Sequence, residues 1–371
     1  MTSIRMLLQL AVAESLKVHQ LDFDSAYLNA EIDCEIYMEP PELFPCNKPS
    51  EVLKIKKSLY GLKQSGRLWN EMLHAYLVEK NFTRSLVDTC VYTQFNGKSK
   101  MIILVWVDDL ILAASDENEL KMVKMEMQSH FKMKDLGVLK FFLGIEIQVE
   151  GNVIKMMQSK YIGRVLKRFR MTDCKPKDIP CTLGVNKELG LDSQLLDESR
   201  HRLYREMVGS IIYVMTGTRP DICYAVTLLS QHLANPTETH LKLCKDVIRY
   251  LKKTQFHALR FVKPKELSLT GFCDADWGGS KDRKSISGYC FTLNPKGALI
   301  SWRSSKQRSV ATSSCEAEYI ALTEAVKESK FLRQLLSDMT GCGTESVLLY
   351  DDNQSAIKLA KNPVFHDRSK H

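Results

Sequence analysis

The sequence has 371 residues, of which 44% are hydrophobic and 26% are charged, and its formal net charge is +8. This length allows roughly two or three domains, and the composition is that of a globular protein, neither fibrous nor disordered. The apolar runs are shorter than the ~18–20 residues that span a bilayer and the start has no signal-peptide pattern, which argues against membrane and secreted proteins. The positive charge is compatible with a nucleic-acid partner. The 11 cysteines form no Cys-x-x-Cys pair, so we expect reduced thiols in an intracellular protein, without a disulfide framework or a zinc site.

Helix and strand signals alternate over the first part of the chain. A helix is expected over residues 2–16, because apolar residues recur from Ile4 with the helical period and Thr2 or Ser3 can cap it. The other elements expected here are strands over 18–28, 52–55, 91–95 and 101–114, helices over 67–80 and 117–131, a loop over 40–49 and a strand pair from 141. The order β, α, β, β, α, β predicts a sheet with helices packed on one side, an α+β layering.

A polar connection over 172–200 leads to two predicted helices. The first begins at Pro220 and ends before Asn235, and the second covers 237–253. The second helix carries a basic stripe, which is either a solvated face or a contact for backbone phosphates: Lys242, Lys245, Arg249 and Lys252. The pattern then changes to strands over 267–273, 288–293, 299–302 and 347–350 and a helix over 314–339, so we place a domain boundary near 266.

An acidic pair, Asp108-Asp109, joins two short apolar runs within Met101–Ser115. Such runs favour strands that are buried on both faces, and together they predict a hairpin with carboxylates at its tip. The turn contains neither Gly nor Asn, so turn preferences alone do not explain the acids. If the strand carrying Asp22 lies beside this hairpin, three carboxylates converge and favour a divalent metal site, since a cation would neutralise them. The alternatives are a purely structural turn and an Asp22 without a special role.

Four motifs resemble the reverse transcriptase of copia-type LTR retrotransposons. They are Leu21-Asp-Phe-Asp-Ser-Ala-Tyr-Leu-Asn, Ser58-Leu-Tyr-Gly-Leu-Lys-Gln-Ser, Trp106-Val-Asp-Asp-Leu and Phe131-Lys-Met-Lys-Asp-Leu-Gly. The resemblance implies a palm subdomain in which Asp22, Asp108 and Asp109 are catalytic and bind two Mg²⁺ ions, with Mn²⁺ as a substitute. It also implies that the residues contacting the nucleotide and template are Tyr27, Tyr60, Gly61, Lys63 and Trp106. The segment 143–147 looks like the primer-gripping hairpin that follows.

The sequence departs from this family's pattern at two motif positions. Trp106 stands where the family usually has Tyr, and Ser65-Gly66 stands where it usually has Ala-Pro. An aromatic ring is retained at Trp106, so we expect little effect there. The fingers of the family, whose basic residues clamp the nucleotide triphosphate, lie N-terminal to the first motif and are expected to be absent from this chain.

A second acidic series lies in the C-terminal third. Asp274 is placed at the end of a strand, and Ser313 with Glu316 forms a capping-box pattern that begins a helix. Glu318 shares an apolar face of that helix with Ala321 and Ala325, so it points toward the sheet, where a buried carboxylate favours a metal over an unremarkable polar residue.

This series resembles ribonuclease H of the same elements. The resemblance implies that Asp274, Glu318 and Asp352 are catalytic and bind two metal ions, with Asp276 and Asp351 as lower-ranked neighbours. The reaction implied is hydrolysis of the RNA strand of an RNA–DNA hybrid. The family's fourth acidic ligand lies just beyond a stretch that here is His366–His371, so we expect that ligand to be missing, and we assign no metal role to His366 or His371.

Taken together, the sequence predicts an α+β protein with three parts. They are a ferredoxin-like antiparallel reverse-transcriptase palm over 1–160, helical thumb and connection segments over 161–265, and a mixed-sheet ribonuclease H-like domain over 266–371. The partners implied are an RNA template, a DNA primer, RNA–DNA hybrid and deoxynucleoside triphosphates, in the cytoplasm within a virus-like particle or in the nucleus. The alternative is a catalytically decayed or co-opted fragment that only binds nucleic acid.

Overall fold

A computed structural model describes residues 1–42, 44–45, 51–97, 99–182, 184, 194–343 and 346–362. The chain divides into two compact units. The small unit comprises Leu16–Leu139 and Asp338–Cys342, and the large unit comprises Met1–Ser15, Lys140–Ser337 and Gly343–His371. No helix within the described ranges is long and apolar enough to cross a membrane. The three predicted domain ranges remain predictions.

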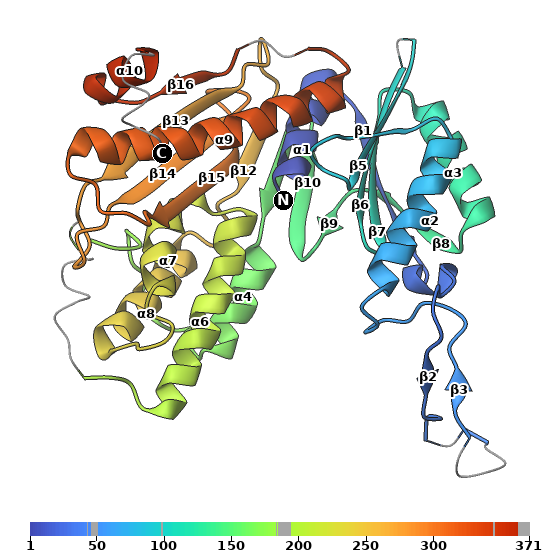
Figure 1. The fold of residues 1–371 in the computed structure, drawn as a ribbon, viewed down its shortest axis with the longest axis horizontal. Helices are drawn as coiled ribbons and strands as arrows, with labels where there is room; N and C mark the ends of the chain where they lie inside the picture. The colour runs from blue at the N-terminus through green and yellow to red at the C-terminus, as the bar shows by residue number, and fades with distance from the viewer. Residues whose placement is uncertain are drawn as a thin grey trace. The chain divides into compact units, whose positions relative to one another are not determined.

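The small unit is built on a six-stranded antiparallel sheet in the order β4-β5-β6-β7-β1-β8 (Figure 1). Its strands are β1 (Lys17–Phe23), β4 (Thr83–Arg84), β5 (Val91–Asn96), β6 (Ser99–Trp106), β7 (Asp109–Ala114) and β8 (Met133–Val138). The other elements of this unit are η1 (Ala26–Asn29), α2 (Ser65–Glu79), α3 (Glu117–His130) and the short pair β2 (Tyr37–Met38) and β3 (Leu53–Lys54).

One face of this sheet packs against α2 and α3. Alternate residues of β6, such as Ile103 and Val105, share a core with Trp69 and Leu73 of α2. The intervening residues are buried as well, Ile102 completely, which is why β6 has a continuous apolar sequence and not an alternating one. The expected hairpin, with helices on one side of the sheet, is therefore confirmed. The expected loop over 40–49 lies partly outside the described residues.

The large unit contains a second antiparallel sheet, β12-β11-β10-β9. Its strands are β9 (Phe141–Phe142), β10 (Ile145–Glu150), β11 (Val153–Met157) and β12 (Leu259–Val262). The N-terminal helix α1 (Thr2–Glu14) belongs to this unit. Its buried Arg5 donates hydrogen bonds to the carbonyl of Ile300 (2.7 Å) and the carbonyl of Thr216 (2.9 Å) and lies 3.9 Å from the ring centre of Trp302.

Four helices of the large unit share one hydrophobic core. They are α4 (Ser159–Arg168), α6 (Glu198–Gly217), α7 (Cys223–Ser230) and α8 (Glu238–Lys253), with the short η2 (Pro220–Ile222) before α7. Helices α4 and α6 were not predicted from the sequence, and the helix predicted from Pro220 to before Asn235 was too long, since α7 ends at Ser230. The β-branched run near Ile211 in α6 is typical of strands, but it packs with Tyr204 and Val214 on one helical face, and that tertiary packing outweighs the local preference.

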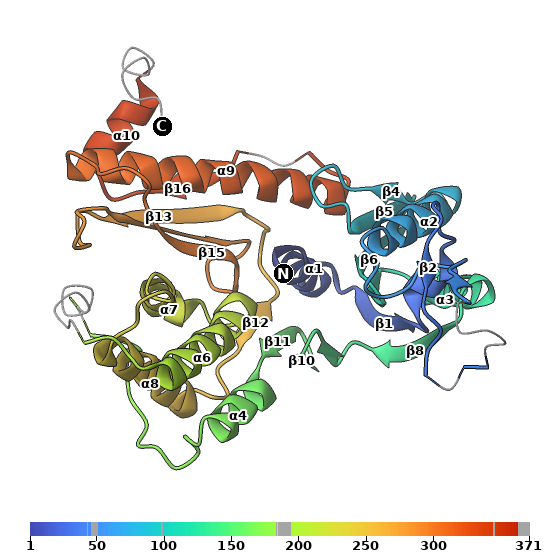
Figure 2. The ribbon, with the colours of Figure 1, turned by 60° about the horizontal axis from the view of Figure 1, so that its bottom comes forward.

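The last sheet is mixed, in the order β15-β14-β13-β16. Its elements are β13 (Thr270–Asp276), β14 (Ile286–Thr292), β15 (Leu299–Lys306), α9 (Ser314–Thr340), β16 (Leu348–Tyr350) and α10 (Gln354–Lys361). β13 runs parallel to β16 and antiparallel to β14. Helix α9 covers one face, where Glu328 accepts a hydrogen bond from Ser301, and α7 lies on the other, where Thr227 donates to the carbonyl of Ser304 (Figure 2). The expected mixed fold with antiparallel sheets is confirmed, whereas the palm, thumb and ribonuclease H layout remains a prediction.

Candidate active sites

The first candidate site lies where β1 meets the β6–β7 hairpin. Asp22 of β1 is the direct cross-strand partner of Asp109 of β7. Asp108 occupies the two-residue turn, and its carbonyl accepts a 2.8 Å hydrogen bond from the amide of Phe23. The sheet therefore brings together the three acids that the sequence analysis singled out, from positions far apart in the chain.

The turn of this hairpin has an unusual backbone. Val107 has a φ of 54°, in the left-handed region that β-branched residues avoid. Its carbonyl accepts a 2.9 Å hydrogen bond from the indole Nε1 of Trp69, a buried residue of α2. Conformations of this kind cost about 1–3 kcal/mol and persist only when the surroundings enforce them. Here the contact with Trp69 helps to hold Val107 in place.

Neighbouring side chains donate hydrogen bonds to two carboxylates of the first site, those of Asp108 and Asp109. The Tyr60 hydroxyl donates to both oxygens of Asp108, at 2.7 and 2.8 Å, and its ring stacks on Tyr27 with 4.4 Å between centroids. Gln20 donates to Asp109 at 2.9 Å. Burial raises the pKa of Asp109, Gln20 opposes that rise, and the charges of Asp22 and Asp108 add to it. Burial and the contact with Asp108 raise the pKa of Tyr60 to about 12.

The remaining residues predicted for the first site, Gly61, Lys63 and Trp106, are exposed. Gly61 has a φ of 101° and no side-chain neighbour, so its need for glycine comes from the backbone conformation alone. Lys63 is exposed, and Trp106 is half exposed on the strand that enters the turn.

The predicted primer-gripping segment, 143–147, belongs to the large unit and includes the two-residue turn Leu143–Gly144 between β9 and β10. Its Glu146 is buried and accepts hydrogen bonds from Ser159 and the amide of Lys160, at the start of α4.

The second candidate site gathers three acids from three elements. Asp274 lies on β13, Glu318 on α9, and Asp352 just after β16. One ligand atom from each lies within 4.8 Å of the others, and among the described residues no other group of three or more ligand-type side chains meets this spacing. The carboxylates of the first site are thus less tightly grouped than those of the second site.

Glu318 is the buried member of this cluster. It is 7% exposed, and its Oε2 is buried without a hydrogen-bond partner. Burial and the charges of Asp274, Asp351 and Asp352 raise its pKa to about 7. Burial and the neighbouring acids, Asp352 first, also raise the pKa of Asp274. An orphaned carboxylate oxygen among like charges fits a divalent cation, because hard oxygen donors are the ligands that Mg²⁺ and Mn²⁺ take.

The lower-ranked acids have other contacts. Asp351 accepts hydrogen bonds from the amide of Asn353 (2.8 Å) and from the thiol of Cys273 (3.5 Å), so it shapes the turn after β16. Asp276 lies close to Gly279, where a side chain would collide with its carboxylate. Ser313 accepts from the amide of Glu316, as the capping-box pattern predicts, and the Glu316 carboxylate accepts from the amide and the hydroxyl of Thr312. His366 and His371 lie outside the described residues.

Two contributors were missed at the sequence level. Gln20 lies two residues before Asp22, and the strand period of two would have placed it on the same face. The thiol of Cys273 precedes Asp274 directly and carries no such signal. Its pKa is raised to about 12 by burial and by Asp351, so it remains a neutral donor.

The basic stripe of α8 is divided in the structure. Arg249 and Lys252 donate to the carbonyls of Lys175 and Cys174, both at 2.6 Å, and so hold the segment after α4 against the helix. Lys242 and Lys245 are exposed. Half of the stripe therefore has a structural role, and only its first two residues present a solvated basic surface.

The sequence has relatives among known proteins along its whole length. Residues 1–183 match the family described as reverse transcriptase (RNA-dependent DNA polymerase). Over its whole length, the chain is 39% identical to the retrovirus-related Pol polyprotein from transposon TNT 1-94 of Nicotiana tabacum, and the match covers 28% of that protein. It is 38% identical to the corresponding polyprotein from transposon RE1 of Arabidopsis thaliana, of which the match covers 25%. The chain thus spans about a quarter of these relatives.

One solved structure, the foamy viral protease–reverse transcriptase in complex with dsDNA, aligns with 95% of this chain and 64% of its own, at 12% identity and a TM-score of 0.48. The sequence relatives, which match the chain from end to end, are what identify it. The putative transposon Ty5-1 protein of Saccharomyces cerevisiae is 32% identical over 83% of this chain and is covered over its full length. The chain belongs to the family of copia-type retrotransposon Pol proteins, and its residues 1–183 match the reverse transcriptase of that family.

Proposed function

We propose that this chain carries two nucleic-acid-processing sites of a retrotransposon Pol polyprotein. One is an RNA-directed DNA polymerase site at Asp22, Asp108 and Asp109. The other is a ribonuclease H site at Asp274, Glu318 and Asp352. The observation that carries the proposal is the second cluster, whose ligand atoms lie within 4.8 Å and whose buried Glu318 has an orphaned oxygen.

At the ribonuclease H site, the three acids would hold a divalent cation. Asp274 and Asp352 come from adjacent parallel strands, and Glu318 reaches them from α9. A bound cation there would polarise the scissile phosphate and lower the pKa of the attacking water. With a pKa of about 7, Glu318 is partly protonated near neutral pH and releases that proton when it becomes a ligand. The 2′-hydroxyl would identify the RNA strand of the hybrid.

At the polymerase site, the acids sit on a rigid sheet. Asp22 and Asp109 are held as a cross-strand pair, and Asp108 projects from the turn beside them. Tyr27 and Tyr60 form the adjoining aromatic stack, on which the sugar of an incoming deoxynucleoside triphosphate would lie. An RNA template and a DNA primer complete the proposed substrates. The Tyr60 hydroxyl, which donates to both oxygens of Asp108, would compete with a cation for that carboxylate.

Cleavage of an RNA–DNA hybrid tests the ribonuclease H assignment. We expect the chain to cut the labelled RNA strand of a hybrid in Mg²⁺ or Mn²⁺, and Asp274→Asn to abolish cutting. Asp351→Asn serves as a matched control, because Asp351 shapes the turn, and it should retain most of the activity. Cleavage that survives Asp274→Asn would overturn the assignment.

Primer extension on an RNA template tests the polymerase assignment independently. We expect extension in Mg²⁺ that is lost in Asp108→Asn. No extension by the unmodified chain would refute the polymerase assignment. Salt-sensitive hybrid binding without cleavage or extension would instead show a protein that only binds nucleic acid.

A further inference from the structure

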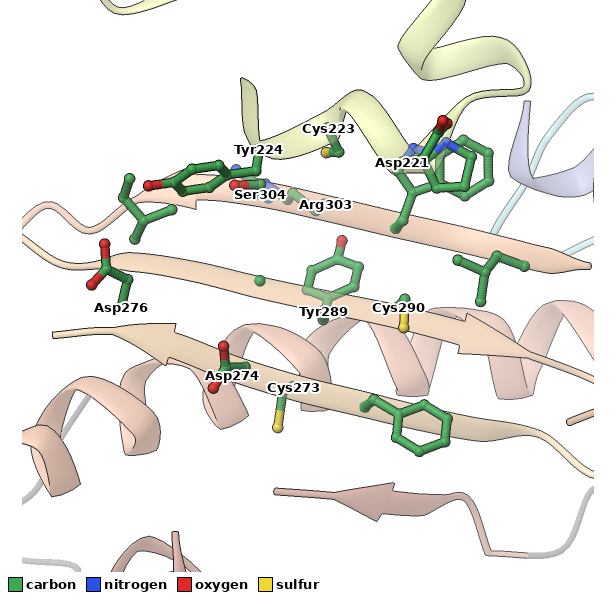
Figure 3. Close-up of a pocket in the computed structure, with 16 residues that line it drawn as sticks. Asp221, Cys223, Tyr224, Cys273, Asp274, Asp276, Tyr289, Cys290, Arg303 and Ser304 are labelled. Atoms are coloured by element: carbon green, nitrogen blue, oxygen red, sulfur yellow. The ribbon is translucent and has the colours of Figure 1, made fainter. Parts of the chain in front are cut away.

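A cavity of about 610 Å³ lies between α7 and the face of the C-terminal sheet opposite α9 (Figure 3). Asp274 and Asp276 of β13 line one side of it, and Cys223 and Tyr224 of α7 line the other. Its volume falls in the ~300–1,000 Å³ range of small-molecule sites. Since Asp274 also belongs to the acidic cluster, the cavity adjoins the proposed ribonuclease H site.

The floor of the cavity has a gap beside Asp274. Gly288 of β14 is the direct cross-strand partner of Asp274, and Cys290 is the partner of Phe272. These four residues share one face of the sheet, because antiparallel partners and residues two apart point to the same side. A Cβ added to Gly288 would meet only the carbonyl of Arg303, at 3.8 Å. The missing side chain therefore leaves open space that a ligand can enter.

An exposed aromatic pair borders the same acids. Phe272 and Tyr350 lie opposite each other on the parallel strands β13 and β16. Their rings stack with 5.2 Å between centroids and 16° between planes, although they are 43% and 49% exposed. Phe272 precedes Asp274 by two residues, and Tyr350 precedes Asp352 by two. The pair thus forms an aromatic platform in line with the acidic cluster.

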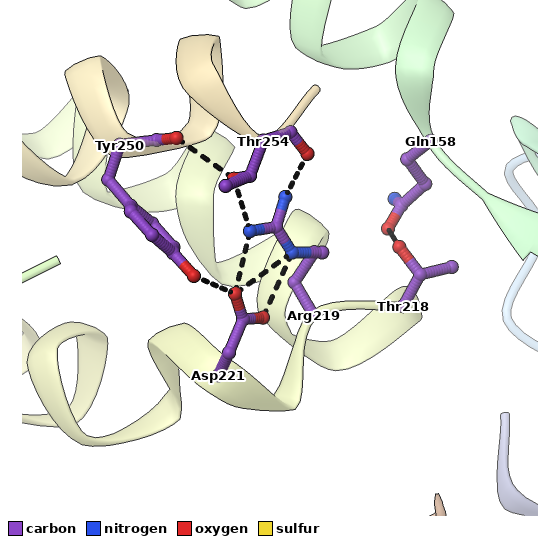
Figure 4. A network of polar contacts seen from close by, with 6 residues as sticks. All are labelled: Gln158, Thr218, Arg219, Asp221, Tyr250 and Thr254. Atoms are coloured by element: carbon purple, nitrogen blue, oxygen red, sulfur yellow. Dashed lines mark hydrogen bonds and ion pairs between the residues drawn. The ribbon is translucent and has the colours of Figure 1, made fainter. Parts of the chain in front are cut away.

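The roof of the cavity is anchored by an ion pair between the buried Arg219 and the more exposed Asp221 (Figure 4). Arg219 is 2% exposed and donates to the Asp221 carboxylate (2.6 Å) and the carbonyl of Thr254 (2.9 Å). The hydroxyl of Tyr250 also donates to Asp221, at 2.7 Å. With its carboxylate held by two partners, Asp221 fixes η2 and the start of α7 at the end of the cavity. The cavity is therefore preformed, and a ligand need not pay to order it.

The lining indicates which chemical group fits. Ile286, Trp302 and Cys290 give an apolar interior, and Asp274 and Asp276, two negative charges against the positive Arg303 in the same lining, disfavour phosphate in the absence of a cation. Planar rings match such a site, because aromatic walls bind the faces of bases by stacking. We propose that this cavity and its aromatic platform bind a nucleobase of the strand processed at Asp274. This inference rests on the proposed ribonuclease H function and adds a base subsite to it.

Nucleoside binding to the full chain, without metal or hybrid, tests the subsite. Adenosine should quench the fluorescence of Trp302 with a dissociation constant of roughly 0.1–1 mM, the affinity of a small fragment. Trp302→Phe should remove the quenching, while saturation-transfer NMR still detects the ligand. Ribose 5-phosphate, which lacks a base, should not bind. Equal binding of ribose 5-phosphate would overturn the proposal.

Filling the gap should block the subsite. Gly288→Leu should weaken adenosine binding at least tenfold, and the matched control Gly209→Leu, an exposed position of α6 with open space around it, should not change it. Phe272→Leu, at an exposed position that tolerates substitution, should weaken it about threefold by removing one stacking ring. Unchanged affinity in both Gly288→Leu and Phe272→Leu would refute the site. Since no cleavage is measured, failure here leaves the proposed function standing, and lost cleavage alone leaves the subsite standing.

Discussion

The two acidic sites contain the same kind of residues but accommodate their charges differently. In the small unit, Tyr60 donates to both oxygens of Asp108 and Gln20 donates to Asp109. In the large unit, one carboxylate oxygen from each of the three acids lies within 4.8 Å of the others, and the buried Oε2 of Glu318 has no hydrogen-bond donor. The first site is stabilised by the chain's own hydrogen bonds, whereas the second lacks a compensating group that a cation would supply.

Acid type and strand position define a candidate site, while neighbouring hydrogen-bond donors decide the charge state of its carboxylates without metal. Burial without a hydrogen-bond donor raises the pKa of a carboxylate, and the charged form then destabilises the folded state at high pH. A carboxylate with a tyrosine donor is stabilised without metal, and that donor competes with a cation. The following substitutions test the contrast, beginning with the largest expected effect.

Glu318→Gln should separate stability from metal binding at the second site. The folded-state pKa of Glu318, about 7, exceeds its ordinary 4.5, so the folded chain binds the extra proton between these values. Stability without metal should therefore fall as pH rises from about 4.5 to 7, and Glu318→Gln should remove that fall.

The same variant should lose the stabilisation by divalent cations, which is about 2.7 kcal/mol at a hundredfold excess over the dissociation constant. Thermal unfolding with and without Mn²⁺ measures both effects, in an Asp108→Asn background that removes cation binding at the first site. Glu324→Gln, a surface position of the same helix, is the control. A metal-induced shift that persists in Glu318→Gln would contradict the assigned ligand.

Tyr60→Phe should open the first site to cations. The lost hydrogen bond to a charged group is worth about 1.5 kcal/mol, so Mn²⁺ should bind roughly tenfold more tightly. The substitution Asp274→Asn removes cation binding at the second site, so calorimetry in that background measures the Mn²⁺ affinity of the first site alone. Identical affinities with and without the hydroxyl would show that Tyr60 does not oppose metal binding.

Val107→Gly should stabilise the hairpin that carries the acidic pair. Glycine adopts the φ of 54° without strain, and the gain should exceed its entropy cost, for a net of about 1 kcal/mol. Urea unfolding measures it, with Val105→Gly, in the regular strand before the turn, as the destabilising control. A loss of stability in Val107→Gly would mean that the valine side chain contributes more than its backbone costs.

His19→Gln should change the pH dependence of the small unit by less than 1 kcal/mol. Burial, and then Lys124, lowers the pKa of His19, whose Nδ1 accepts from Lys124 at 2.6 Å. Because the folded pKa is below the ordinary 6.5, stability is full above pH 6.5 and falls as acidification protonates the ring. The variant should unfold with less pH dependence between pH 7 and 5, and an unchanged profile would exclude His19 as its source.

Much of this molecule could be predicted from local signals. The continuous apolar runs around Asp108 identified the hairpin, and the strand pattern around Asp22 identified its neighbour. The spacing of Glu318 and Ala321 in the sequence predicted the buried face of α9 correctly. These features depend on periodicity within a few residues, which is why the sequence is sufficient.

The features that were missed depend on tertiary contacts. Helix α6 was hidden by its β-branched run, and it becomes intelligible only with the other helices packed around Val208. The contact between Tyr60 and Asp108 joins residues 48 positions apart, with no local signal. The cavity beside Gly288 arises from two elements that approach each other in the fold, so no sequence pattern announces it.

The turn at Val107 has a consequence for the order of folding. Its own sequence disfavours the conformation it adopts, and the hydrogen bond from Trp69 that holds it becomes available only after α2 has docked on the sheet. The turn is therefore a poor nucleus, and the strands on either side must be aligned by their apolar residues first. We therefore expect the acidic pair to reach its final geometry as one of the last steps, when the surrounding core already excludes other pairings.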